Sequence, residues 1–260
     1  MSILGRFFRL CGVGMPVVVM TGGLILAASL HLSVREVGAQ SLMSCPFRVD
    51  GSRQYMFRSG KTDGKVSLKN GLSEGDVYGY GQVNLLQGDI VFYNGKSYIA
   101  VPGPDKPVVE ERDDLKAVFL AYGRSQIWQE IPIERELFGM DEVNDFIEET
   151  AKSLNMDMEE MFVFRIEGKV EYAKYGVIYR DPTNTARHTP GQHSSATSHY
   201  EVEGENLFIV GAWAGEDNSG QYTARTETMQ MYMINEAKDK AGHIENIHIQ
   251  PGAMLYWPNC

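Results

Sequence analysis

The sequence Gln230-Met-Tyr-Met-Ile-Asn-Glu-Ala-Lys-Asp-Lys-Ala-Gly-His243 has the pattern of a strand, a turn and the start of a returning strand. Side chains alternate between the two faces of a strand, so Gln230, Tyr232 and Ile234 share one face. The turn through residues 238–242 returns the chain to His243. We therefore expect Gln230, Tyr232 and His243 to lie close together, although an ordinary hairpin with one partly buried histidine has the same pattern.

The hairpin lies in a second half of the chain that contains little helix. Residues 161–169 and 170–179 are both strand-like, and Gly168 is expected to turn the chain between them. Residues 181–199 are rich in Pro, Thr, Ser, Gly and His without a period, which predicts a long loop. Three further strands are expected, at residues 206–213, 229–234 and 243–249.

The first half is expected to be mainly sheet with one helix. Residues 65–102 read as strands and turns, and Asn94-Gly95 between β-rich runs is a strong hairpin signal. Residues 141–155 have helical periodicity, and Asp141 is placed to cap the start. The apolar face of this helix consists of Val143, Phe146, Ile147, Ala151 and Leu154. The pattern indicates an α+β protein with halves at residues 40–155 and 156–260.

The N-terminal segment differs from the rest of the chain. Arg6 and Arg9 precede an apolar run, and Val37-Gly-Ala39 supplies small residues for a cleavage site. This pattern favours a cleaved signal peptide over residues 1–39, and a membrane anchor formed by residues 10–30 is the alternative. Either interpretation predicts an exported protein, periplasmic or secreted, that contacts a membrane only if the segment is not cleaved.

The net charge bears on the partners of the chain, and the cysteines bear on its cross-linking. The formal net charge of −10 would repel phosphate backbones, so a nucleic-acid partner is not expected. The oligomeric state is not predicted. Cys45 and Cys260 stand near the two ends of the mature chain, where they form either one disulfide or two free thiols.

Two other groups of residues carry candidate chemistry. His188, His193 and His199 in the expected loop have imidazoles that bind metals, but their spacing matches no standard pattern, so a polar loop is the alternative. The acidic run formed by Glu110, Glu111, Asp113 and Asp114 is expected to be solvated surface.

Four stretches, taken in order over residues 60–257, resemble the alpha-acetolactate decarboxylase family. They are Gly60-Lys-Thr-Asp-Gly; Tyr80-Gly-Gln-Val-Asn-Leu-Leu-Gln-Gly-Asp-Ile-Val-Phe-Tyr-Asn-Gly; Met161-Phe-Val-Phe-Arg-Ile-Glu-Gly-Lys; and Gly211-Ala-Trp with the hairpin that follows. The resemblance implies a mixed β-sheet in the N-terminal half, a barrel-like β-sheet in the C-terminal half and a zinc ion between them. Three histidines of the hairpin would hold this zinc, which acts as a Lewis acid during decarboxylation.

The family's functional positions are only partly matched in this chain. His243 stands at the third zinc ligand, while Gln230 and Tyr232 occupy the first two. Asp89 stands at the position of a glutamate, and the arginine position falls on Gly176. Arg180 lies two strand positions further along the same face and is a candidate substitute. The resemblance therefore implies a divergent member with a degenerate zinc site.

Three functions fit this pattern. The first is a non-catalytic module, or pseudoenzyme, that binds a small polar or anionic molecule without metal. The second is a lyase with a rebuilt site, in which Asp89, Tyr232 and Arg180 act beside His243. The third is acetolactate decarboxylation, leading to acetoin, with metal ligands supplied by the histidine-containing loop.

Overall fold

The computed structural model describes residues 46–72 and 76–259. The N-terminal segment 1–39, Cys45 and Cys260 lie outside the described residues, and the predictions made for them stay predictions. The described residues belong to one compact unit, whose fold is given below. Among the described residues, none of the helices has the length and apolar character needed to cross a bilayer.

The first sheet is built from the N-terminal part of this unit. In spatial order its strands are β1 (Phe47–Gly51), β7 (Lys116–Arg124), β3 (Val77–Val83), β4 (Asp89–Tyr93), β5 (Lys96–Val101) and β6 (Val108–Glu111), with β2 (Val66–Ser67) paired to β7. Its pairings among the described residues are all antiparallel, where a mixed sheet was expected. Asn94 and Gly95 have positive φ and join β4 to β5, which confirms the predicted hairpin.

The second sheet closes partly on itself. Its strands are, in order, β8 (Trp128–Pro132), β15 (Met254–Pro258), β10 (Phe162–Ile178), β12 (Asn206–Trp213), β13 (Met229–Asn235), β14 (Ala241–Ile249) and β9 (Leu137–Phe138), with β11 (Thr197–Glu203) paired to β10. Because β10 pairs with both β12 and β14, the strands β10, β12, β13 and β14 form a ring. The predicted barrel-like sheet is therefore confirmed. The chain passes from the first sheet to the second between β7 and β8.

Strand β10 is one continuous strand, so the turn predicted at Gly168 is wrong. The strand runs unbroken through Gly168, pairing with β12 before it and with β14 after it. Gly168 has φ 145°, and a Cβ there would lie 2.8 Å from Cα of Ala253. Glycine is required because residues with a side chain rarely adopt this φ and because another backbone approaches here.

Few helices flank the sheets. They are α1 (Arg53–Ser59), α2 (Leu68–Leu72), the 3-10 turn η1 (Asn84–Leu86), α3 (Gly139–Ser153) and α4 (Pro190–Ser195). Helix α3 confirms the helix predicted over residues 141–155, but the cap predicted at Asp141 is wrong. The backbone N–H of Phe138, at the cap position, instead donates to the Glu142 carboxylate at 2.7 Å.

The long loop predicted at residues 181–199 contains regular structure. Thr189 and Gln192 form a capping box that starts α4, and β11 begins at Thr197. Thr-Pro-x-Gln is a helix-start signal, and it was overlooked because the segment is too short to show a period.

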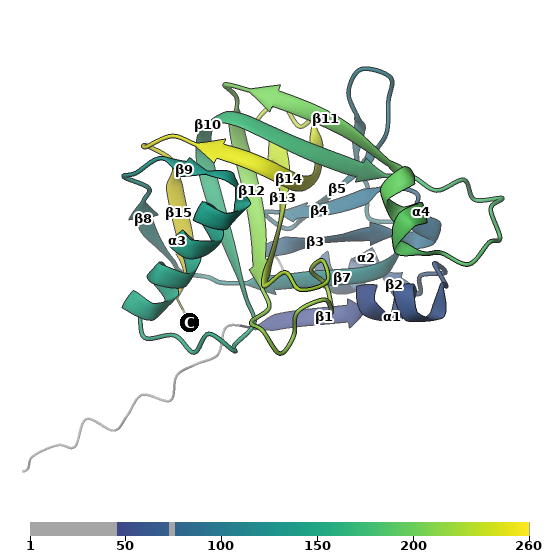
Figure 1. Ribbon diagram of the computed structural model, residues 1–260, viewed down its shortest axis with the longest axis horizontal. Coiled ribbons are helices and arrows are strands. Elements are labelled where there is room, and N and C mark those ends of the chain that lie inside the picture. The colour runs from purple at the N-terminus through teal and green to yellow at the C-terminus, as the bar shows by residue number, and fades with distance from the viewer. Residues whose placement is uncertain (1–45, 73–75, 260) are drawn as a thin grey trace, which may run out of the picture. The chain divides into compact units, whose positions relative to one another are not determined.

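The two sheets pack against each other through a shared apolar core (Figure 1). A largely buried ion pair within β10 lies where they meet: Arg165 Nη1 is 2.8 Å from Glu167 Oε1. The same Glu167 oxygen accepts a 2.8 Å hydrogen bond from the hydroxyl of Tyr93 on β4. The guanidinium also lies 4.4 Å from the ring centroids of Tyr78 and Trp128. Arg165 therefore contacts both sheets.

Removing Arg165 should destabilise the fold strongly. Arg165→Ala leaves the Glu167 carboxylate without its cation and is expected to lower the free energy of unfolding, measured in urea, by about 3–5 kcal/mol. Lys152→Ala, which breaks the exposed Lys152–Glu148 pair, is the control and should cost under about 0.5 kcal/mol. Equal losses for the two variants would contradict a buried, sheet-joining role for Arg165.

Candidate functional site

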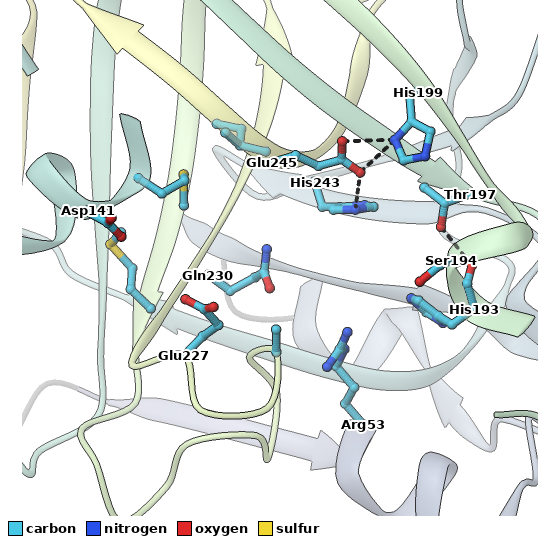
Figure 2. Close-up of a pocket in the computed structure, with 14 residues that line it drawn as sticks. Arg53, Asp141, His193, Ser194, Thr197, His199, Glu227, Gln230, His243 and Glu245 are labelled. Atoms are coloured by element: carbon cyan, nitrogen blue, oxygen red, sulfur yellow. Dashed lines mark hydrogen bonds and ion pairs between the residues drawn. The ribbon is translucent and has the colours of Figure 1, made fainter. Parts of the chain in front are cut away.

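A cavity of about 380 Å³ opens beside the β13–β14 hairpin (Figure 2). Gln230, His243 and Glu245 reach it from the hairpin, His193 from α4 and Arg53 from α1. Asp141 and Glu227 are exposed and lie toward the opposite side of the cavity from His193 in Figure 2. The cavity therefore combines a partly buried wall of histidine and arginine with an exposed acidic rim.

The hairpin brings its predicted residues together, but they do not all face the cavity. Tyr232 and His243 are paired across β13 and β14, with ring centroids 5.9 Å apart. Tyr232 is buried and stacks on Tyr80 at a centroid distance of 4.3 Å. Burial raises the pKa of Tyr232 well above its usual value, so its phenol stays neutral. Of the pair, only His243 presents its side chain to the cavity.

Asp89 lies behind His243 and joins the two sheets at the site. Its side chain is fully buried, and Oδ2 lies 3.4 Å from Nδ1 of His243. The same carboxylate accepts hydrogen bonds from the backbone N–H of Ile178 at 3.1 Å and from the Gln82 amide at 3.4 Å. Asp89 therefore acts on the cavity through His243.

Glu245, which the sequence did not single out, is the second carboxylate beside His243. Its Oε1 lies 3.6 Å from His243 Nε2 and 2.8 Å from His199 Nδ1. Burial alone would lower the pKa of His243, but Asp89 and Glu245 raise it to about 9. Burial alone would raise the pKa of Glu245, but His243 and His199 lower it to about 2. At neutral pH His243 is thus a cation between two carboxylates.

Strand alternation could have pointed to Glu245, which lies two positions after His243 on the same strand.

Gly176 leaves the room that the His243 ring occupies. The two residues are paired across β10 and β14, and a Cβ on Gly176 would lie 2.5 Å from His243 Cε1 and 2.7 Å from Thr197 Cγ2. An arginine at this position, as the resemblance implies for the family, would collide with the His243 side chain. The missing arginine and the position of His243 are therefore linked.

The three histidines of residues 181–199 do not form one group. His188 is fully buried, and its Nε2 lies 3.1 Å from Nδ1 of His193. Burial, with nearby arginines, lowers the pKa of His188 to about 4 and that of His193 to about 2, so both rings are neutral. His193 and His199 line the cavity, and His188 supports His193 from behind.

Arg180 does not lie on the cavity wall, although it was expected on the same face as Gly176. It follows the end of β10, and its Nη1 donates to Thr62 Oγ1 at 2.9 Å. Its Nη2 donates to the backbone oxygen of Ala186. Arg180 therefore holds the segment after β10 against the connection between α1 and β2.

Arg53 is the arginine that reaches the cavity, and sequence reasoning missed it. It is the first residue of α1, which Ser52 caps by accepting a 3.0 Å hydrogen bond from the Tyr55 N–H. Arg53 Nη1 donates to the backbone oxygen of Thr223 at 2.8 Å, and the guanidinium lies 5.0 Å from the Phe57 ring centroid. Ser52 could have predicted the helix start, but no local pattern indicates that Arg53 faces a cavity formed by distant segments.

The side chains present do not fit a zinc ion held by three imidazoles. Gln230 offers a neutral amide, Tyr232 is a neutral buried phenol, and both nitrogens of His243 face carboxylates. Within residues 46–72 and 76–259, no group of three or more His, Cys, Asp or Glu side chains is arranged to hold a metal ion. A catalytic zinc needs about three protein ligands, and this hairpin supplies one.

The fold and cavity define a class of protein: two packed antiparallel sheets, one closed into a ring, with a polar cavity at a strand hairpin. The alpha-acetolactate decarboxylase family model matches residues 52–256, and the chain belongs to this family. The resemblance seen in the four sequence stretches is thereby confirmed.

Solved structures support the same assignment of fold. Alpha-acetolactate decarboxylase from Bacillus subtilis strain 168 is 12% identical, with a TM-score of 0.67 over 82% of this chain and 86% of that one. Acetolactate decarboxylase from Bacillus subtilis subspecies spizizenii is 13% identical, with a TM-score of 0.69 over the same shares. A Staphylococcus aureus protein of unknown function, similar to alpha-acetolactate decarboxylase, is 13% identical, with a TM-score of 0.66 over 81% and 83%. No curated protein matches the sequence.

A side chain at position 176 should displace His243. Gly176→Ala is expected to lower the free energy of unfolding by about 1–3 kcal/mol, because the strand has no room for a Cβ. The matched control is Gly191→Ala in α4, where a Cβ would meet nothing within 4 Å and where alanine should be neutral or stabilising by up to about 1 kcal/mol. If chemical denaturation gave the same stability for both variants, the tight fit between Gly176 and His243 would be wrong.

Proposed function

We propose that this member of the acetolactate decarboxylase family binds a small carboxylic acid in the hairpin cavity, using Arg53 and His243 in place of zinc. The observation that carries the proposal is the surroundings of the Arg53 side chain. Its guanidinium is partly buried and faces the cavity, and among the described residues it forms no ion pair with a carboxylate. Burial lowers the pKa of Arg53, but guanidinium groups remain charged in proteins.

A ligand carboxylate would complete the surroundings of Arg53. A cation removed from water is costly unless an anion or several hydrogen bonds compensate it. Within the described part of the chain, the Arg53 side chain donates one hydrogen bond, to the backbone oxygen of Thr223, so most of its N–H groups are available. A guanidinium presents these donors as a planar fork that matches a carboxylate.

His243 is suited to a neighbouring polar group of the same ligand. Asp89 and Glu245 already balance its charge, so it does not require an anion of its own. Its Nε2 lies 3.6 Å from Glu245 Oε1, a long contact, so a keto or hydroxyl oxygen of the ligand would compete with Glu245 for this N–H. The cavity of about 380 Å³ suits a small 2-hydroxy-3-keto acid.

A second candidate function is decarboxylation of such an acid. The supporting observation is the raised pKa of His243, about 9, which keeps a cation next to the cavity at neutral pH. A cationic N–H donor beside a ketone oxygen stabilises the charge that develops when carbon dioxide leaves. Glu245 would be the carboxylate beside the ligand, because Asp89 is fully buried. Tyr232 and Arg180, the other residues expected to act in a lyase, do not line the cavity.

Export is part of the proposal and rests on the sequence pattern of residues 1–39 alone. Mass spectrometry of the protein from its natural host should find a mature chain that begins at Gln40. A chain that keeps residues 1–39 would favour the membrane anchor instead.

Binding should depend on Arg53 and not on a metal. Calorimetric titration with acetolactate, in protein treated with a chelator, should show binding that Arg53→Ala weakens at least about tenfold, since a charge-assisted hydrogen bond contributes roughly 1.5–3 kcal/mol. Arg53→Lys should have an intermediate effect, because it keeps the charge and loses the fork. Lys169→Ala, a distant surface change, is the control, and circular dichroism checks the fold of each variant.

The same samples separate the two candidate functions. Acetoin and carbon dioxide formed by chelator-treated protein, and lost in His243→Gln, would favour the lyase. Acetolactate bound but unchanged would favour the binding module. Binding that appears only after zinc is added, or that Arg53→Ala leaves intact, would contradict the proposal.

A further inference from the structure

A second, larger cavity of about 670 Å³ adjoins the hairpin cavity. The two share Arg53, His193, Ser194 and Ala224 in their walls. We call the larger cavity the outer chamber; Arg58, Ser219 and Arg225 line it and do not line the hairpin cavity. Arg53 stands in the wall between the two compartments, so a molecule bound at Arg53 can extend into the outer chamber.

The outer chamber is cationic in an acidic protein. Its lining includes Arg53, Arg58 and Arg225 and contains no Asp or Glu, whereas the whole chain has a formal net charge of −10. Within the part of the chain that the structure describes, neither Arg58 nor Arg225 forms an ion pair. A concave surface with charge of one sign focuses the electrostatic field and attracts the opposite charge.

The structure holds these arginines on two segments that are tied together. Arg58 lies in the last turn of α1, and Arg225 lies in the connection between β12 and β13, residues 214–228. The backbone N–H of Arg53 donates to Gln221 O at 2.9 Å, which fixes that connection against α1. A backbone hydrogen bond therefore fixes the two segments that carry the arginines, and the shape of the chamber does not depend on the arginine side chains alone.

The chamber wall is not uniformly polar. Phe57 and Pro190 give the wall an apolar portion beside the arginines. Together the walls offer cationic groups and an apolar surface, which match an anionic group carried on a short hydrocarbon spacer.

We propose that the outer chamber binds a second anionic group of the ligand, so that the natural ligand is a small acid with two anionic ends joined by a short apolar spacer. This inference rests on the proposed binding of a carboxylate at Arg53. One end would lie at Arg53 in the hairpin cavity, and the other, a carboxylate or a phosphate, would lie between Arg58 and Arg225.

Calorimetry with matched acids tests this directly. The probes are unbranched α,ω-dicarboxylates from succinate to suberate, each paired with the monocarboxylate of the same chain length. At least one dicarboxylate should bind about tenfold more tightly than its monocarboxylate partner, because the second group engages without a separate association cost. In Arg58→Ala/Arg225→Ala the advantage should fall below about threefold while monocarboxylate binding is unchanged.

Two controls make the result specific. Lys116→Ala/Lys169→Ala removes two positive charges elsewhere on the surface and should leave the dicarboxylate advantage intact. Inorganic phosphate should compete with the dicarboxylate and not with the monocarboxylate, which would distinguish an anion held by the chamber itself from one held at Arg53. All four substituted residues are exposed, so these variants should keep the fold, as thermal unfolding would verify.

The outcomes separate this inference from the function on which it rests. No dicarboxylate advantage, or an advantage that survives Arg58→Ala/Arg225→Ala, would overturn the two-ended ligand even if monocarboxylates bind at Arg53. If Arg53→Ala leaves monocarboxylate affinity unchanged, the proposed function would instead be overturned. In that case a phosphate site lost in Arg58→Ala/Arg225→Ala would still support an anion-binding outer chamber.

Discussion

The burial of the Asp89 carboxylate is the constraint on which the rest of this site depends. Asp89 lies in β4 of the first sheet, fully buried, and a buried carboxylate is tolerated only with hydrogen bonds or a cation. Both come from the second sheet, as the N–H of Ile178 on β10 and the imidazole of His243 on β14. Packing the sheets together therefore fixes where His243 stands and favours its charged form. Gly176 completes the arrangement by leaving space for the ring.

This constraint accounts for how the hairpin differs from a three-histidine zinc site. A metal ligand must offer a neutral imidazole with a free nitrogen lone pair. Here Asp89 and Glu245 raise the pKa of His243 to about 9, and Tyr232 is committed to stacking on Tyr80. The positive charge that zinc would bring is thus carried by protein groups, His243 in the hairpin and Arg53 on the opposite wall.

The sequence alone predicts the features that depend on neighbouring residues. The Asn94-Gly95 hairpin and helix α3 follow from turn chemistry and periodicity, which act over a few residues. Gly168 was misinterpreted because glycine favours both turns and close backbone approaches, and only the position of Ala253 decides between them. The approach of Asp89 to His243, 154 residues apart, was expected only through the family resemblance.

Arg53 was beyond prediction, because its environment is assembled from α1, α4 and residues 214–228.

The most direct test is an NMR pH titration of the His243 imidazole in protein freed of metal by a chelator. The account predicts a pKa of about 9, which falls when Asp89→Asn removes one of the two carboxylates that raise it. A His243 pKa at or below 6.5 in the metal-free protein, or one that Asp89→Asn leaves unchanged, would contradict the account.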